Sequence, residues 1–146
     1  MIRTKLILVD GITGSGKSTT AHFIARQMEK NGIKVKWFYE QEKKHPLRDK
    51  ILDQKKNESD NAYSVRHFED YIKVWGNFVD SIKDDDTIYI FESFLLQDVL
   101  FYPHFMNDMD PILIENFSIR ILETARSLNP VIIHLYQEDG DRSMRL

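Results

Sequence analysis

The chain has 146 residues, of which 42% are apolar and 12% aromatic, enough for one domain with its own core. Its 20 basic and 23 acidic residues give a net charge of −3 without a basic stripe, which argues against duplex nucleic acid as a partner. Cysteine is absent, so disulfides, thiolate catalysis and cysteine-ligated zinc are excluded. No apolar run approaches the length of a membrane span, and we expect a cytoplasmic protein with no membrane partner.

The first expected elements are a strand, a glycine-rich turn and a helix. Residues 5–10 form an apolar run typical of a buried strand, and residues 11–18 read G-x-x-x-x-G-K-S, the phosphate-binding P-loop. Apolar residues then recur at helical spacing until Asn31-Gly32 ends the pattern. Because the motif lies between a strand and a helix, as its mechanism requires, it predicts a site for a nucleoside triphosphate.

The residue types of the P-loop define the chemistry that we expect there. Three glycines lack Cβ, so consecutive backbone amides can approach the β-phosphate of ATP at the positive end of the helix. Lys17 is expected to reach the β- and γ-phosphates, and the Ser18 hydroxyl is expected to ligate Mg²⁺. The predicted ATP-binding residues are Gly11, Ile12, Thr13, Gly14, Ser15, Gly16, Lys17, Ser18 and Thr19.

The rest of the chain alternates strands with helices. Strands are predicted at residues 35–39, 87–91 and 131–136, and helices at about 60–82, 93–101 and 111–128. A proline at position 103 is expected to end the middle helix, and residues 41–60 are expected to be irregular. This alternation predicts an α/β fold, a three-layer sandwich in which helices flank a mostly parallel sheet. We expect residues 1–146 to be one domain that lacks its natural C-terminal portion or lid.

Acidic residues follow three of the predicted strands. Ligands of such sheets bind at the carboxyl ends of the strands, so Asp10, Glu40 and Glu92 are expected beside the P-loop. Glu92 closes an apolar strand and is expected to hold Mg²⁺; Glu40 is expected to be the general base, with Glu42 as the alternative; Asp10 is expected to brace the loop. The predicted catalytic residues are Lys17, Glu40 and Glu92, and the predicted magnesium ligands are Ser18 and Glu92.

Aromatic side chains are frequent from the second predicted strand to the third. They could stack on a planar acceptor, although helical spacing within the set favours a core stripe. The candidates are Trp37, Phe38, Tyr63, His67, Tyr71 and Trp75, with residues 94–105 as a second wall of the pocket. His134 lies in an apolar strand and is expected in the core, whereas the charged run at 40–45 is expected to be solvated.

The order of these parts resembles the P-loop kinases of the nucleoside and nucleotide kinase group, and is most similar to deoxynucleoside and thymidylate kinases. The resemblance rests on the P-loop, on Phe38-Tyr39-Glu40 after the second strand and on Glu92 after the third. It implies a kinase that uses ATP and Mg²⁺, with Glu40 as its base. The family has an arginine after the third-strand glutamate, which helps to position the acceptor, and here Ser93 stands in its place.

The sequence therefore predicts an enzyme that transfers the γ-phosphoryl group of Mg·ATP to a small-molecule acceptor. A nucleoside or nucleotide acceptor and a sugar or antibiotic acceptor both remain open, as do the preference for ATP over GTP and assembly as a homodimer. The alternative is a P-loop ATPase or a nucleotide-dependent regulatory protein without kinase activity. The chain lacks an Asn-Lys-x-Asp guanine-reading motif, which argues against a GTPase.

Overall fold

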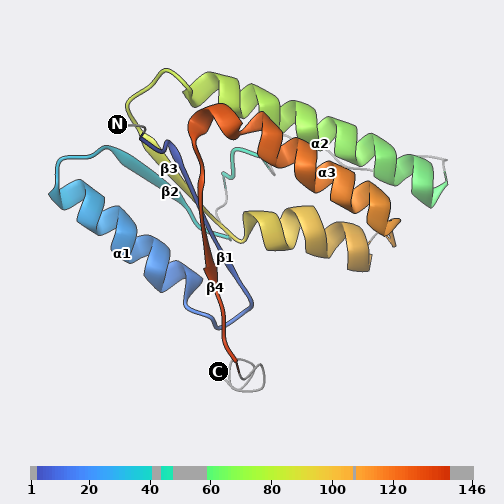
Figure 1. Cartoon of the computed structure of the whole chain (residues 1–146), viewed down its shortest axis with the longest axis horizontal. Coiled ribbons are helices and arrows are strands. Elements are labelled where there is room, and N and C mark those ends of the chain that lie inside the picture. The colour runs from blue at the N-terminus through green and yellow to red at the C-terminus, as the bar shows by residue number, and fades with distance from the viewer. Residues whose placement is uncertain (1–2, 41–43, 48–58, 107, 139–146) are drawn as a thin grey trace.

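A computed structural model describes residues 3–40, 44–47, 59–106 and 108–138. Its four strands form one sheet with helices on both sides (Figure 1). The strands are β1 (Leu6–Gly11), β2 (Val35–Phe38), β3 (Ile88–Glu92) and β4 (Val131–Leu135). The helices are α1 (Lys17–Lys30), α2 (Asp60–Ile82), the π-type helix η2 (Phe94–Met106), α3 (Pro111–Thr124) and the 3₁₀ turn η3 (Arg126–Leu128).

The strands are all parallel and lie in the order β2-β3-β1-β4. In the register, Leu8 of β1 lies opposite Phe91 of β3 on one side and Ile132 of β4 on the other. The predicted α/β sandwich with a parallel sheet is therefore confirmed. Because the strands share one direction, their carboxyl ends meet at a single edge, to which the loop after β1 also belongs.

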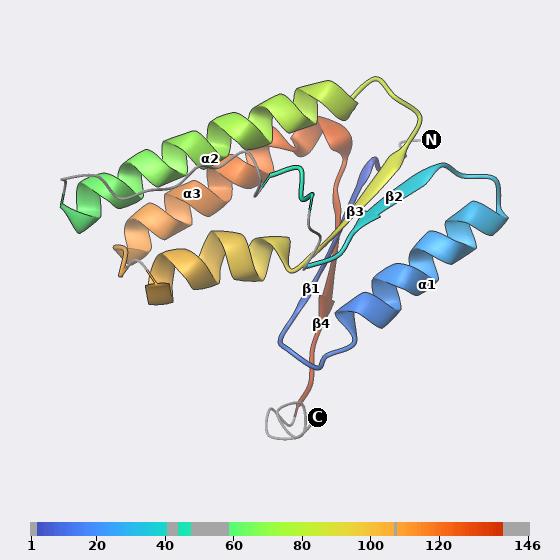
Figure 2. The same ribbon diagram turned by 180° about the vertical axis from the view of Figure 1, so that it is seen from behind.

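Alternation along the strands divides the core into two layers. Ile7 and Val9 of β1 pack with Ile90 of β3 against α1, while Leu8 and Phe91 face the opposite way. In Figures 1 and 2, α1 covers one face of the sheet, and α2, α3 and η2 cover the other. In the part of the chain that the structure describes, no helix is long and apolar enough to cross a membrane.

Helices α2 and α3 begin at side-chain caps and bury the apolar faces that their sequences predict. The hydroxyl of Ser59 accepts from the Ala62 amide at 3.2 Å, and the carboxylate of Asp110 accepts from the Ile112 amide at 2.9 Å. Pro111 occupies the first turn of α3, where its missing N–H has no helical partner to lose. The buried residues of the two stripes are Phe68, Tyr71, Trp75, Phe78, Val79, Ile82, Ile114, Phe117 and Ile121.

The predicted end of the helix after β3 and the predicted burial of His134 are wrong. The helix after β3 continues through Pro103 to Met106, because the wider turn of a π-type helix relieves the clash of the ring with the preceding turn. His134 is exposed rather than buried, since it lies on the edge strand β4 and on the face away from α1.

His45 departs from the expected solvated run. Residues 41–43 lie outside the described residues, but His45 is buried, with its ring centroid 5.6 Å from that of Phe91 and 6.1 Å from that of Phe38. Its Nδ1 accepts from the amide of Leu47, which is itself buried. The segment after β2 therefore folds back onto the core at this point.

The contact between α2 and α3 depends on ring packing that a truncation should disrupt. Phe117 stacks on Phe68 with centroids 3.9 Å apart and meets Tyr71 edge-on. We expect Phe117→Ala to lower the free energy of unfolding by about 3–5 kcal/mol, measured by urea denaturation. Ile112→Ala on the same helix, where the side chain is 65% exposed, should change it by less than about 0.5 kcal/mol. Equal losses in the two variants would contradict this assignment of the core.

Candidate active site

The P-loop leaves β1 and presents the beginning of α1 without a side-chain cap. Gly14 and Gly16 have φ values of 80° and 92°, which a residue with a Cβ rarely adopts. Gly16 is the N-cap of α1, and no side chain of the described residues bonds to its first amides. These amides and the positive end of the helix macrodipole are therefore available to an anion.

Gly11 is required because the loop lies against neighbouring atoms. A Cβ at this position would lie 2.5 Å from the Ser15 Oγ and 2.8 Å from the carbonyl oxygen of Leu135. The Ser15 hydroxyl is buried and has no hydrogen-bond partner among the described residues. Just beyond β4, the side-chain amide of Gln137 donates to the carbonyl of Gly14 at 3.4 Å. The end of β4 therefore contacts the P-loop at two points.

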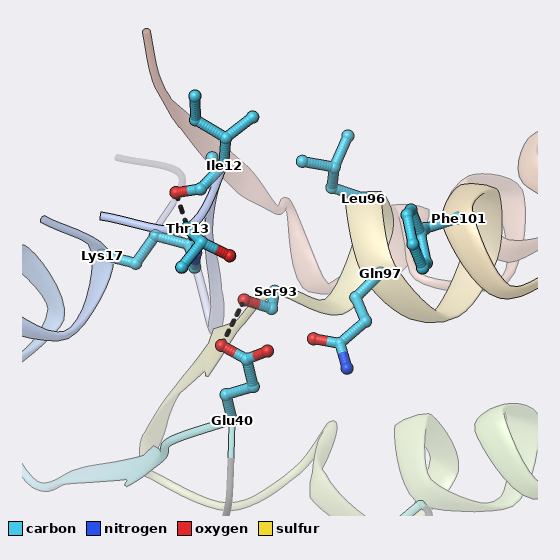
Figure 3. Close-up of a pocket in the computed structure, with 9 residues that line it drawn as sticks. Ile12, Thr13, Lys17, Glu40, Ser93, Leu96, Gln97 and Phe101 are labelled. Atoms are coloured by element: carbon cyan, nitrogen blue, oxygen red, sulfur yellow. Dashed lines mark hydrogen bonds between the residues drawn. The ribbon is translucent and has the colours of Figure 1, made fainter. Parts of the chain in front are cut away.

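Lys17 lies in the first turn of α1 and is buried. Its Nζ donates to the carbonyl oxygen of Ile12 at 3.1 Å, so the side chain bends back across the loop (Figure 3). A buried ammonium group with a backbone carbonyl for a partner can bind an anion that enters the loop.

A cavity of about 350 Å³ lies against the P-loop, within the size range of small-molecule sites. Its walls come from the P-loop, from Glu40 two residues after β2, from Ser93 and from η2 (Figure 3). The lining residues are Gly11, Ile12, Thr13, Lys17, Glu40, Ser93, Leu96, Gln97 and Phe101. The structure thus brings Lys17 and Glu40, which are far apart in the sequence, to the same cavity.

Ser93 connects β3 to η2 and contacts Glu40. Its hydroxyl donates to Glu40 Oε2 at 3.2 Å, and its amide donates to the carbonyl of Val9 at 3.0 Å. Ser93 is buried and has a φ of 59°, an uncommon conformation for a residue other than glycine. Where the resembling kinases have an arginine, this chain therefore has a short donor aimed at the candidate base.

Glu92 is buried at the end of β3, and each of its carboxylate oxygens accepts a hydrogen bond. Ser18 Oγ donates to Oε1 at 2.5 Å, and the indole Nε1 of Trp37 donates to Oε2 at 2.5 Å. The sequence predicted Ser18 and Glu92 together but placed Trp37 in the acceptor pocket. The alternation of β2 was the available signal, since Val35 and Trp37 belong on the face that packs against α1.

The donor set at Glu92 fits Mg²⁺. A carboxylate and a hydroxyl are hard oxygen ligands, and Mg²⁺ usually takes one or two of these from the protein and completes its shell with phosphate oxygens and water. The residues described here contain no cluster of three or more His, Asp or Glu side chains that could hold a metal ion. A metal bound at Ser18 and Glu92 would therefore depend on the phosphates of a nucleotide.

Asp10 is directed to η2 rather than to the P-loop that we expected it to brace. Its carboxylate accepts from the Leu96 amide at 3.1 Å and from the Leu95 amide at 3.4 Å, in the first turn of η2. Burial raises the pKa of Asp10, although these two amide bonds oppose that effect. Asp10 thus fixes the beginning of the helix that forms one wall of the cavity.

The predicted aromatic pocket is mostly core. Phe38, Tyr71 and Trp75 are buried between the sheet and its helices, and Tyr63 stacks on His67 along α2, outside the cavity. The ring that does line the cavity is Phe101, from the segment expected to form the second wall. The alternative base, Glu42, lies outside the described residues.

A P-loop after the first strand of a parallel sheet, with α1 on one face and the other helices opposite, is the architecture of a P-loop protein with a nucleotide-kinase-like fold. The sequence matches no family model and no curated protein. The structure is similar to thymidylate kinase from Candida albicans, with a TM-score of 0.53 and 16% identity over 99% of this chain and 67% of that chain. Thymidylate kinase from Ehrlichia chaffeensis aligns with a TM-score of 0.49 and 16% identity over 97% and 95% of the two chains.

Because the pKa of Asp10 is raised, the stability of the protein should depend on pH in a defined direction. The folded state binds this proton more tightly than the unfolded state does, so the contribution of Asp10 to stability falls as pH rises from 3.8, its ordinary pKa, through the raised value. Asp10→Asn removes that titration and keeps an oxygen acceptor for the amides of η2. Urea denaturation at several pH values in this range measures the free energy of unfolding of both proteins. As pH rises, the variant should become more stable relative to the wild type. A difference that moves the other way would contradict the prediction.

Proposed function

We propose that this protein is a kinase that transfers the γ-phosphoryl group of Mg·ATP to a small-molecule acceptor, with a nucleoside or nucleotide as the favoured class. The observation that carries the proposal is the cavity in which the P-loop and Lys17 face Glu40. One end of this cavity suits a phosphate chain, and the other has a carboxylate that could accept the proton of a hydroxyl. The similarity in fold to a thymidylate kinase supports a nucleotide acceptor.

The proposed mechanism depends on positioning and charge. The amides at the beginning of α1 would bind the phosphate chain, and Lys17 would neutralise charge on the transferring group. Ser18 and Glu92 would hold Mg²⁺, which supplies further positive charge beside the phosphate oxygens when it is bound. Glu40 would accept the proton of the acceptor, and the hydroxyl of Ser93 would keep the carboxylate of Glu40 directed into the cavity.

Substitution of Lys17 tests the proposed phosphoryl transfer. We expect Lys17→Ala to reduce acceptor-dependent release of ADP from Mg·ATP by about 10²-fold or more, because a charge aimed at the transition state is lost. The assay would use nucleosides, nucleoside monophosphates, sugars and aminoglycosides as acceptors. Lys30→Ala, at the exposed end of α1, is the control and should retain activity. If the protein binds ATP but turns it over with none of these acceptors, the regulatory alternative would be favoured instead.

Glu40 and Ser93 give a paired test of the base. Glu40→Gln should lower kcat by about 10²–10⁴-fold while leaving the affinity for ATP unchanged. Ser93→Gly removes the donor and relieves the positive φ, so it should lower kcat by about tenfold without loss of stability. Steady-state kinetics and thermal unfolding measure both effects. Full activity in Glu40→Gln would exclude Glu40 as the base.

A further inference from the structure

The bond between Trp37 and Glu92 crosses from the edge strand to its neighbour. In the pairing of β2 with β3, Trp37 lies opposite Ile90, two residues before Glu92 on the same face. The indole Nε1 reaches forward to Glu92 Oε2, and Glu92 as a whole is only 1% exposed. A buried carboxylate needs donors, and here one comes from the P-loop helix and one from β2.

The indole ring of Trp37 also packs against a side chain of α1. His22 stacks on Trp37, with ring centroids 5.3 Å apart and an interplanar angle of 21°. His22 lies four residues after Ser18, one helical turn further along the same face of α1. The helix that provides the hydroxyl for one oxygen of Glu92 therefore also packs against the ring that binds the other oxygen.

The two oxygens of Glu92 consequently have separate partners. Oε1 faces Ser18, the predicted metal ligand of the P-loop, whereas Oε2 is held by Trp37 on the far side. Hydrogen bonds to the outer oxygen of a metal-binding carboxylate orient the inner oxygen, and their loss typically weakens metal binding about 10–100-fold.

We propose that Trp37 is a positioning residue for magnesium: its indole N–H fixes Glu92 so that Oε1 and Ser18 together face the cation of Mg·ATP. This inference rests on the proposed ATP site but not on the identity of the acceptor or on turnover. It assigns to β2 a role in nucleotide binding that is separate from that of Glu40, two residues beyond the strand. A bond that served only to satisfy a buried carboxylate would affect stability and leave the response to Mg²⁺ unchanged.

The first test compares the affinity for ATP with Mg²⁺ and with EDTA, by titration calorimetry on the full chain. We call the ratio of the two dissociation constants the magnesium gain, because it measures how much Mg²⁺ strengthens the binding of ATP. Trp37→Phe keeps a ring beside His22 but removes the N–H, and should reduce that gain about 10–100-fold while the affinity in EDTA stays the same. Tyr39→Phe, a change to an exposed neighbouring ring, should keep the full gain.

The outcomes separate this inference from the proposed function. Retention of the full magnesium gain in Trp37→Phe would overturn the role of Trp37. Wild-type protein that binds Mg·ATP but phosphorylates no acceptor would remove the kinase proposal, and the comparison of magnesium gains would still decide the role of Trp37. Wild-type protein whose affinity for ATP is the same with Mg²⁺ and with EDTA would overturn both the metal site and this inference.

A second test needs no substitution at Trp37. The other tryptophan, Trp75, is buried on the opposite face of the sheet, where its N–H donates to the carbonyl of Ile121 at 2.9 Å. Adding Mg²⁺ to the ATP complex should therefore change the emission of Trp37 alone. Glu92→Gln should abolish the change, and wild-type emission that does not respond to Mg²⁺ while calorimetry shows metal-dependent binding would overturn the inference.

Discussion

The pairing of β1 with β3 is the constraint on which the site depends. Val9 lies opposite Glu92, and the amide of the next residue, Ser93, donates to the carbonyl of Val9. This register sets the P-loop, which follows β1, beside the carboxylate that ends β3. A shift of one residue would turn Glu92 to the opposite face of the sheet, away from Ser18 on α1. The backbone ladder therefore determines which side chains can meet.

Charged and polar groups lie buried at this edge of a mostly apolar core. Asp10, Lys17 and Glu92 are each buried, and each has a hydrogen-bond partner in the backbone or in a neighbouring side chain. Such groups contribute little net stability, because their desolvation offsets much of what their bonds provide. Their hydrogen bonds do, however, hold these side chains in fixed orientations at the edge of the sheet.

The sequence predicted the features that depend on local pattern. The P-loop, the order of strands and helices, and the nearness of Ser18 to Glu92 follow from motif and periodicity. The hydrogen bond of Trp37 and the contact of Ser93 with Glu40 did not, because they depend on the register between strands and on a single positive φ. The burial of His45 was missed for a different reason: a charged run does not show where the chain folds back onto the core.

The close contact of Gly11 with Leu135, together with the bond from Gln137 to Gly14, joins the P-loop mechanically to the chain that follows β4. The contact at Gly11 is tight, since a Cβ there would lie 2.8 Å from the carbonyl oxygen of Leu135. The backbone positions of the P-loop and of the end of β4 are therefore not independent of each other. A change in the shape of the loop would then act directly on Leu135 and Gln137 through these contacts.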